Sequence, residues 1–305
     1  MTQLRFDDRV AVITGAGRGL GRAYAELLAA RGAQVVVNDP GGTMRGDLFE
    51  ADVAAEVVRA ISDSGGEAVA STDSVSTPAG GQAIIDTALK TYGRIDILIH
   101  NAGTVRPGSL TELSFEDFEA VLDVHLRGAF HIVRAAFPQM SDAGYGRVVL
   151  TSSIGGLYGN QKVANYAAAK SAMIGLSNVI ALEGAPVGVK SNVIAPAALT
   201  RMAEGIDTSA YPPMQPELVA PAVGWLAHET CSVSGEMLVA IAGRVARAYI
   251  GETPGVYQPS WTIEQIAEQI DDIRDTTGDN WILPVVPSAH IDHIVKSFAL
   301  TTEGQ

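Results

Sequence analysis

The sequence has a single cysteine and lacks any long apolar run. Cys231 is the only cysteine among 305 residues, so the chain cannot form an intramolecular disulfide. No grouping of cysteine and histidine suggests zinc, and we expect no bound metal. No run of about 18 apolar residues is present, which argues against a membrane span. The lone thiol is typical of a protein from a reducing compartment.

Basic residues are also few. Lysine and arginine total 21 against 34 acidic residues, which gives a formal net charge of −13. Such a charge opposes attraction to the phosphates of a nucleic acid, so we expect no nucleic-acid binding. The N-terminus enters a strand pattern without an apolar secretory region, and the C-terminal letters TTEGQ are not a peroxisomal address. We therefore expect a cytoplasmic protein.

Short apolar runs alternate with segments of helical spacing along most of the chain. With 47% hydrophobic and 18% charged residues, the composition is that of a globular protein with a large core. This alternation predicts a parallel sheet covered on both faces, with ligands beyond the carboxyl ends of the strands. The seven expected strands are Arg9 to Thr14, Gln34 to Asn38, Glu67 to Ser71, Ile95 to His100, Arg147 to Thr151, Val189 to Ile194 and Glu236 to Ala240. The expected helices are Leu20 to Ala30, Ala51 to Ser64, Ala79 to Tyr92, Phe115 to Met140 and Val163 to Glu183.

The pattern weakens near residue 243. Pro- and Gly-containing stretches follow, with helix-like segments at Thr262 to Ile273 and Ile291 to Phe298. We therefore expect a Rossmann-type, doubly wound α/β domain over residues 1–243. Residues 244–305 are predicted to form a helical extension that packs on the same domain.

A glycine-rich turn follows the first expected strand. The letters TGAGRGLG place Gly15, Gly17, Gly19 and Gly21 between that strand and a helix. Glycines allow a tight turn and a close approach of backbone to a diphosphate, and the helix N-terminus supplies free N–H groups. A tight turn needs glycine for steric reasons too, so the pattern alone is weak. Its position in the first strand–turn–helix unit strengthens the interpretation as a dinucleotide site.

Asp39 ends the second expected strand about 20 residues after the glycines, as a dinucleotide site requires. Its carboxylate can accept hydrogen bonds from both ribose hydroxyls of NAD, whereas a 2′-phosphate would be repelled. We therefore expect NAD. Arg18 is a contrary sign, since a cation in the glycine loop could pair with a 2′-phosphate, and NADP stays open as the lesser alternative.

Tyr166 and Lys170 lie four residues apart in a strongly helical stretch, so their side chains share one face. The ammonium can then lower the pKa of the phenol toward the range where it works as a base. An exposed pair at this spacing would be unremarkable on a helix surface. Thr151, Ser152 and Ser153 end the fifth expected strand, however, and place hydroxyls at the same edge of the sheet.

Taken in order, TGAGRGLG, Asn101-Ala102-Gly103, Ser153 and Tyr166-AAA-Lys170 resemble the short-chain dehydrogenase/reductase family over about residues 7–243. The resemblance implies that Ser153 orients the substrate, Tyr166 transfers the proton and Lys170 binds the nicotinamide ribose. It also implies that Asn101 and Gly103 form the cofactor wall. The cofactor-binding residues expected are Gly15, Gly17, Arg18, Gly19, Leu20, Gly21, Asp39, Asp73 (at the adenine), Asn101, Ala102, Gly103, Tyr166, Lys170 and Pro196 (beside the nicotinamide).

Two positions depart from the family pattern. His125 stands where many members carry asparagine, and Pro196 is followed by Ala197 where Pro-Gly is common. His125 could hold a water molecule through a ring nitrogen or pack between helices, and the sequence favours the packing role slightly. The loop from Ala197 to Pro213 is placed to close over a substrate.

A narrower resemblance is carried by VVVNDPGG, VHLRGAF, GRVVLTSS, ANYAAAK and VAPAVGWLAHETC. These strings are similar to the dehydrogenase part of peroxisomal multifunctional enzymes of fatty-acid oxidation, which implies a 3-hydroxyacyl-CoA substrate, of fatty-acid or steroid origin. The alternatives are a 3-oxoacyl-[acyl-carrier-protein] reductase, a hydroxysteroid dehydrogenase and a non-catalytic dinucleotide-binding regulator. The resemblance also implies a dimer or tetramer in which the helices expected at Phe115 to Met140 and Val163 to Glu183 pair across a two-fold axis.

Overall fold

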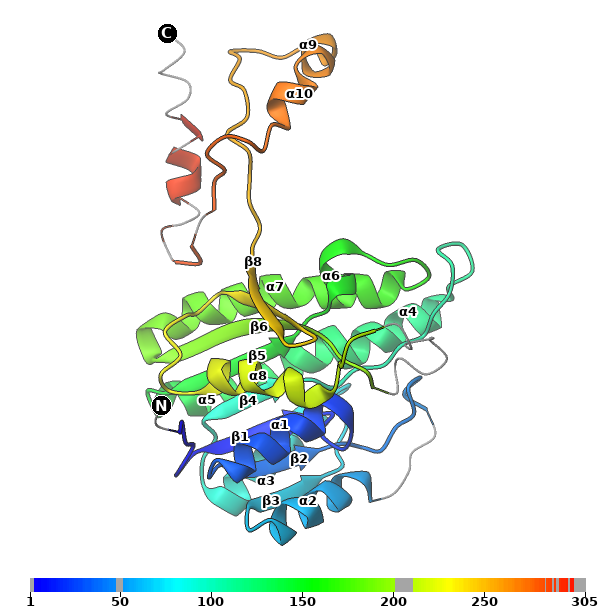
Figure 1. Ribbon diagram of the computed structural model, residues 1–305, viewed down its shortest axis with the longest axis vertical. Helices are drawn as coiled ribbons and strands as arrows, with labels where there is room; N and C mark the ends of the chain where they lie inside the picture. The colour runs from blue at the N-terminus through cyan, green and yellow to red at the C-terminus, as the bar shows by residue number, and fades with distance from the viewer. Residues whose placement is uncertain are drawn as a thin grey trace. The chain divides into compact units, whose positions relative to one another are not determined.

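A computed structural model describes residues 3–47, 52–200, 211–282, 284–286, 288, 291–295 and 297–298 (Figure 1). The chain divides into two compact units, Met1–Arg247 and Ala248–Gln305. The first unit contains the sheet and the helices that cover it. The packing of the C-terminal extension on this unit stays a prediction.

The first unit is built on an eight-stranded sheet in the order β3-β2-β1-β4-β5-β6-β7-β8. All the pairings from β3 through β7 are parallel, so the predicted doubly wound fold is confirmed. The strands are β1 (Val10–Thr14), β2 (Gln34–Asn38), β3 (Glu67–Ser71), β4 (Ile97–His100), β5 (Gly146–Thr151), β6 (Val189–Ala197), β7 (Met237–Ile241) and β8 (Arg244–Ala248).

Strand β8 was not expected, so the prediction of seven strands was one short. Its sequence, RVARA, is largely exposed and has no apolar run to mark it. The turn before it consists of Ala242 (φ 49°) and Gly243 (φ 79°). Two consecutive positive φ angles are the geometry of a type I′ hairpin turn, which fits the right-handed twist of a sheet.

Helices cover both faces of the sheet, and each face has its own apolar core (Figure 1). Along β1, Ala11 and Ile13 enter one core while Val10 and Val12 enter the other, because successive side chains of a strand alternate. Helices α1 (Gly19–Ala30), α2 (Val53–Asp63) and α8 (Ala220–Ala227) form the first core. Helices α3 (Pro78–Tyr92), α5 (Gly128–Asp142) and α7 (Ala164–Gly184) form the second.

The single helix expected from Phe115 to Met140 is wrong in one respect. It consists of α4 (Phe115–Leu122), a π-helical turn η1 (Asp123–Arg127) and α5. A π turn is an insertion into the helical ladder that the 3.6-residue apolar spacing does not reveal. The short helix α6 (Ile154–Tyr158) and helix α8 were not expected either, and the described part of the unit also contains the 3-10 turns η2 (Ala185–Val187) and η4 (Pro216–Leu218).

The register of the parallel strands brings their carboxyl ends into line. Thr14 pairs with Asn38 on one side and with His100 on the other, and Thr151 pairs with Ile194. Thr14, Asn38, His100 and Thr151 are all buried polar residues. The end of each apolar run therefore delivers a hydrogen-bonding group to one edge of the sheet.

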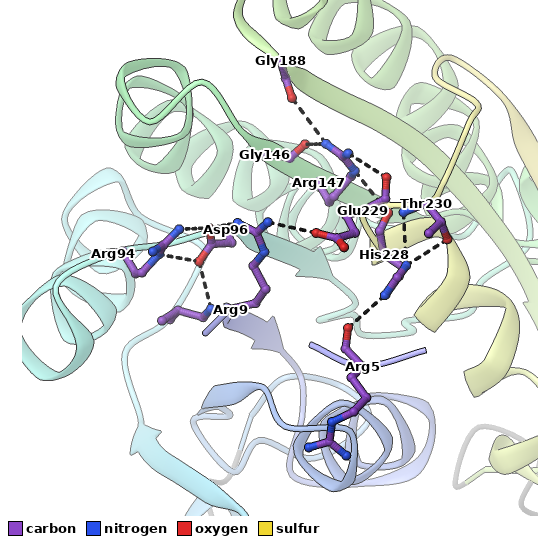
Figure 2. Close-up of polar contacts among 11 residues, drawn as sticks. Arg5, Arg9, Arg94, Asp96, Gly146, Arg147, Gly188, His228, Glu229 and Thr230 are labelled. Carbon is purple, nitrogen blue, oxygen red and sulfur yellow. Dashed lines mark hydrogen bonds and ion pairs between the residues drawn. The ribbon is translucent and has the colours of Figure 1, made fainter. Parts of the chain in front are cut away.

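A polar network lies at the opposite, amino-terminal edge (Figure 2). The carboxylate of Asp96, which is 1% exposed, accepts hydrogen bonds from Arg9 Nη1 at 3.2 Å, Arg94 Nη2 at 2.6 Å and the backbone N–H of Val10 at 3.0 Å. The buried guanidinium of Arg147 donates to the carbonyl oxygens of Gly146, Gly188, His228 and Glu229. This network joins the starts of β1, β4 and β5.

The C-terminal unit contains α9 (Ile263–Glu268) and α10 (Ile270–Ile273), and residues 291–295 are also helical. Thr262 begins α9 with a capping box completed by Gln265, so the sequence signal for a helix start was correct. The ring of His293 packs edge-on against Trp281 at 5.9 Å between centroids, and its Nε2 lies 2.8 Å from Glu252. Within the described ranges, none of the helices is long and apolar enough to cross a membrane.

Replacing Asp96 tests the amino-edge network. Asp96→Ala leaves the buried N–H of Val10 without its acceptor and removes the carboxylate that Arg9 and Arg94 share, so we expect the free energy of unfolding to fall by about 2 kcal/mol. Urea denaturation of both proteins measures the difference. The control is Asp86→Ala, whose partly exposed carboxylate pairs with Lys90 on the surface of α3 and should change stability by less than about 0.5 kcal/mol. Equal losses in the two variants would contradict the structural role of Asp96.

Candidate active site

A cavity of about 290 Å³ lies at the carboxyl edge of the sheet, beyond β1, β2 and β4. Eight of the predicted cofactor residues line it: Gly15, Arg18, Gly19, Leu20, Asp39, Asn101, Ala102 and Gly103. Gly17, Gly21, Asp73, Pro196, Ser153, Tyr166 and Lys170 are not among its lining residues. Most of the sequence-derived cofactor site therefore converges, and the catalytic candidates form a neighbouring group.

The glycine loop needs glycine for two identifiable reasons. Gly15 has a φ of +61°, and a Cβ atom there would lie 2.8 Å from the Cα of Ala102. A Cβ atom on Gly21 would lie 2.2 Å from the carbonyl oxygen of Gly15. Only glycine lets the loop adopt this turn and lets α1 begin so close to the strand.

Helix α1 begins at Gly19 without a side-chain cap. Its N-cap residue, Arg18, has extended backbone and makes no capping hydrogen bond. The first N–H groups of α1 therefore lack the side-chain acceptor that usually satisfies them. An anionic group in the adjoining cavity can accept these hydrogen bonds, so the loop fits a diphosphate.

Asp39 follows β2 and is held from two sides. Its Oδ2 accepts the backbone N–H of Gly17 at 3.0 Å, and its Oδ1 accepts that of Gly41 at 2.8 Å. A carboxylate has about four acceptor sites, so it can still accept hydrogen bonds from hydroxyl groups in the cavity. The carboxylate thus braces the glycine loop and borders the cavity at the same time.

Hydrogen bonds of Thr14 and Asn101 fix the wall between the glycine loop and β4. Asn101 Nδ2 donates to the carbonyl of Gly15 at 3.1 Å, and Thr14 Oγ1 accepts the N–H groups of Asn101 and Ala102, both at 3.1 Å. On the far side of this wall, a Cβ atom on Gly103 would lie 2.4 Å from the ring of His125. The wall is therefore packed tightly between the cavity and the π turn.

Asp73 is exposed and is not among the residues that line the cavity. Its Oδ2 accepts a hydrogen bond from Ser71 Oγ at 3.3 Å, and its carbonyl accepts one from Asn38 Nδ2 at 2.9 Å. The next residues, 74–76, do line the cavity. The predicted adenine contact of Asp73 stays a prediction.

The segment from Pro40 to Gly46 also lines the cavity and was not among the residues expected at the site. The N–H of Val105 donates to the carbonyl of Met44 at 2.8 Å, and Arg106 Nε donates to the carbonyl of Arg45 at 2.8 Å. These bonds tie the segment to the chain after β4. Glycines at 41, 42 and 46 are typical of irregular backbone, but they do not indicate that the segment lines the cavity.

Ser153, Tyr166 and Lys170 lie close together. Ser153 lies just after β5 and is the N-cap residue of α6, where its Oγ accepts the N–H of Gly155. Tyr166 and Lys170 project from α7, with Lys170 Nζ 5.8 Å from the centroid of the Tyr166 ring. The ammonium donates to the carbonyl of Thr151 at 2.7 Å.

Burial affects both ionisable groups of this trio. It raises the pKa of the Tyr166 phenol, and the hydrogen bond from Ser153 works against that rise. Burial lowers the pKa of Lys170 to about 7. The sequence predicts a lowered pKa for the Tyr166 phenol, and burial of the phenol opposes this. The hydrogen bond from Ser153 favours the phenolate.

His125 contacts Tyr166. It lies in the π turn, and its ring packs edge-on against Tyr166 with centroids 5.3 Å apart. Its Nε2 faces both the N–H of Thr104 at 3.0 Å and the carbonyl of Thr104 at 2.8 Å. Burial, with Lys170 as a second cause, holds the pKa of His125 well below its usual value, so the ring is neutral. In the structure His125 therefore packs against Tyr166, one of the predicted catalytic residues.

Two further predictions concern Pro196 and the loop that follows it, whose residue Thr200 lines the cavity. Pro196 belongs to β6 and pairs in register with Ala240. The loop expected to close over a substrate falls largely on residues 201–210, which lie outside the described residues. Among the residues that the structure does describe, no three His, Cys, Asp or Glu side chains gather in a way that could hold a metal.

Comparison with known proteins assigns most of this chain to one family. The sequence profile of the short chain dehydrogenases matches residues 9–209. The peroxisomal multifunctional enzyme type 2 of Drosophila melanogaster is 46% identical over 91% of this chain and 46% of its own length. The structure of that full-length enzyme superposes with a TM-score of 0.80 at 37% identity, over 98% of this chain and 50% of the other.

Two further relatives differ in how much of their own length this chain covers. A putative short-chain type dehydrogenase/reductase of Mycobacterium tuberculosis is 43% identical over 89% of this chain and 96% of its own length. The peroxisomal hydratase-dehydrogenase-epimerase of Saccharomyces cerevisiae is 40% identical over 99% of this chain and 34% of its own length. The chain therefore spans about half or less of the multifunctional relatives and nearly all of the mycobacterial one.

The buried amine of Lys170 predicts a pH dependence of stability. Between pH 7 and its ordinary value of 10.5, this amine binds more protons in the unfolded chain than in the folded protein. Stability therefore rises with pH across that window, and this contribution is absent from Lys170→Met. Urea denaturation from pH 7 to 10 should show the wild-type free energy of unfolding rising relative to the variant.

Lys90→Met is the matched control, because this side chain is exposed on α3. If the curves of wild type and Lys170→Met ran parallel over the window, the amine of Lys170 would not be desolvated as the structure shows.

Proposed function

Since this chain belongs to the short-chain dehydrogenase/reductase family, we propose that it oxidises the hydroxyl group of a 3-hydroxyacyl-CoA with NAD as the hydride acceptor. The chain is an oxidoreductase by family and by its named dehydrogenase relatives, which sets aside a non-catalytic regulator. The observation that carries the finer proposal is the convergence of Ser153, Tyr166 and Lys170 beside a cavity suited to a dinucleotide.

When bound, the nicotinamide supplies the site that accepts the hydride and a positive charge close to the phenol. The hydroxyl of Ser153 donates a hydrogen bond to the substrate oxygen and holds the carbinol carbon in place. The phenolate of Tyr166 accepts the hydroxyl proton as that oxygen becomes a carbonyl. One hydride and one proton leave the alcohol, and the ketone forms. In the reverse direction Tyr166 returns the proton.

Lys170 supports this proton transfer electrostatically. Its ammonium is anchored on the carbonyl of Thr151, so the charge stays one helical turn from Tyr166. Burial raises the pKa of the phenol, and two nearby positive charges would reverse that rise. The protein therefore needs both cations to make Tyr166 a base near neutral pH.

The position of Asp39 supports NAD over NADP. Two backbone N–H groups hold its carboxylate at the cavity, so it cannot swing away to admit a 2′-phosphate. Like charges would then face each other in a partly buried site. Arg18 lines the same cavity and is the group that would favour the phosphate.

The substrate class rests on the multifunctional relatives. The Saccharomyces cerevisiae protein is a peroxisomal hydratase-dehydrogenase-epimerase, and this chain spans a third of it at 40% identity. A hydroxyacyl-CoA is the natural substrate for a dehydrogenase that works beside a hydratase. A role in lipid metabolism follows, and the cytoplasmic location expected from the sequence stays part of the proposal.

Self-association is also part of the proposal. Helices α5 and α7 carry Phe130 and Val179, each 50% exposed, on the segments expected to pair across a two-fold axis. Apolar side chains on neighbouring long helices are suited to such an interface. Either a dimer or a tetramer could contain this interface.

Removing the Asp39 carboxylate tests the cofactor. Asp39→Ser deletes the acceptor for the ribose hydroxyls and the repulsion toward a 2′-phosphate, so the preference for NAD over NADP should fall by at least about tenfold. The ratio of kcat/KM for the two cofactors measures it. Asp63→Asn, an exposed acid at the end of α2, is the control and should leave the ratio unchanged. A preference for NADP in the wild type would refute the NAD assignment.

Tyr166→Phe tests the chemistry. Loss of the phenol removes the general base, so kcat should fall by about a thousandfold while the Kd for NAD changes by less than about twofold. The absorbance of the reduced nicotinamide follows turnover with 3-hydroxyacyl-CoA, 3-oxoacyl-carrier-protein and steroid alcohol substrates. Tyr92→Phe, on the outer helix α3, is the matched control. Turnover of the carrier-protein substrate alone would replace the proposed substrate class.

A further inference from the structure

His100 is a buried histidine that the proposed chemistry does not use. It is the last residue of β4, is 1% exposed, and pairs in register with Thr14 of β1. A buried imidazole must satisfy two nitrogens, and an aliphatic residue would fill the same space without that requirement. The partners of the two nitrogens therefore indicate what the ring is for.

The hydrogen bonds of His100 admit one arrangement of protons. Its Nε2 lies 3.1 Å from the carbonyl oxygen of His125, which can only accept, so Nε2 carries the hydrogen. Its Nδ1 lies 3.1 Å from Thr14 Oγ1. Because Thr14 Oγ1 already accepts the N–H groups of Asn101 and Ala102, its own proton points to Nδ1. Burial, reinforced by Lys170, lowers the pKa of His100 to about 3, which keeps the ring neutral.

This chain of hydrogen bonds runs in one direction across the site. It starts at the N–H groups of Asn101 and Ala102 in the cavity wall, passes through Thr14 and His100, and ends at the carbonyl of His125. His125 sits in the π turn η1, and its ring packs edge-on against Tyr166. The chain therefore links the wall of the cofactor cavity to the residue that supports the catalytic tyrosine.

We propose that His100 is a positioning residue, whose neutral Nε2–H form holds the π turn so that His125 fixes the ring of Tyr166 against Ser153. A π turn interrupts the regular α-helical ladder, and the carbonyl of His125 accepts the backbone N–H of Gly128 as well as His100 Nε2–H. The donor from outside the helix favours one conformation of the turn. The role acts on the orientation of the phenol, not on the binding of either ligand. It rests on the proposed function, because Tyr166 must be the proton-transfer group for its orientation to set the rate.

Two substitutions of His100 test the roles of its two ring nitrogens separately. The amide N–H of His100→Gln can occupy the place of Nε2 and donate to the carbonyl of His125. His100→Asn places its amide oxygen where Nδ1 was, so it satisfies Thr14 and leaves the carbonyl of His125 without that donor. We expect kcat of the Gln variant to stay within about threefold of wild type and that of the Asn variant to fall by about tenfold. KM for the acyl-CoA and the Kd for NAD should change by less than about twofold in both.

A spectroscopic measurement does not depend on turnover. The full chain has six histidines, so nitrogen-15 labelling of histidine lets the ring of His100 be assigned by its loss in either variant. We expect its nitrogen shifts to show a proton on Nε2 and none on Nδ1 across neutral pH. A ring protonated on Nδ1, or on both nitrogens, would overturn the proposal.

Equal loss of kcat in the Gln and Asn variants, or losses that follow a weaker affinity for NAD, would also overturn it, because a merely structural residue behaves that way. If the wild-type protein showed the expected shifts but oxidised no substrate, the proposed function would fail and the tautomer assignment would stand. The two failures are therefore distinguishable.

Discussion

The parallel register of the sheet is the constraint on which the site depends. Because β1, β2, β4 and β5 are paired in register, Thr14, Asn38, His100 and Thr151 all end at one edge. Their strands are apolar up to that point and cannot bury the last polar side chains against the cores. Thr14 and His100 therefore bond to each other, and Asn38 Nδ2 donates to the carbonyl of Asp73 in the loop beyond. The backbone carbonyl of Thr151 anchors Lys170.

The electrostatics of the site follow from its burial. Lys170, His100 and His125 lie within a common low-dielectric region, and Lys170 disfavours a proton on either ring. Both histidines remain neutral and act through directed hydrogen bonds. The only cation of this inner group is then the ammonium held on the carbonyl of Thr151. This charge has a fixed position beside Tyr166, and under the proposed function it adds to the charge of the nicotinamide.

Much of the fold could be predicted from the sequence, since buried parallel strands are short apolar runs and the runs from Val10 to Ile241 give the observed strands to within a few residues. Asp39 and the Tyr166–Lys170 pair could be placed because each follows from spacing alone. Strand β8 and the π turn could not be predicted, since β8 has no apolar run and the π turn interrupts a helix whose apolar spacing continues.

The role of His100 could not be predicted either, because it depends on hydrogen bonds to Thr14 and His125, which lie far away in the chain. The raised pKa of Tyr166 likewise comes from packing and not from its neighbours in sequence.

The network around Asp96 holds the sheet at the edge remote from the chemistry (Figure 2). A strand of five residues separates the two edges by roughly 17 Å, so changes at one edge have little direct effect on groups at the other. The stability of the sheet and the rate of turnover then depend on different sets of side chains. A heat-tolerant version of this enzyme could be sought by altering the amino edge, with the loops that line the cavity left untouched.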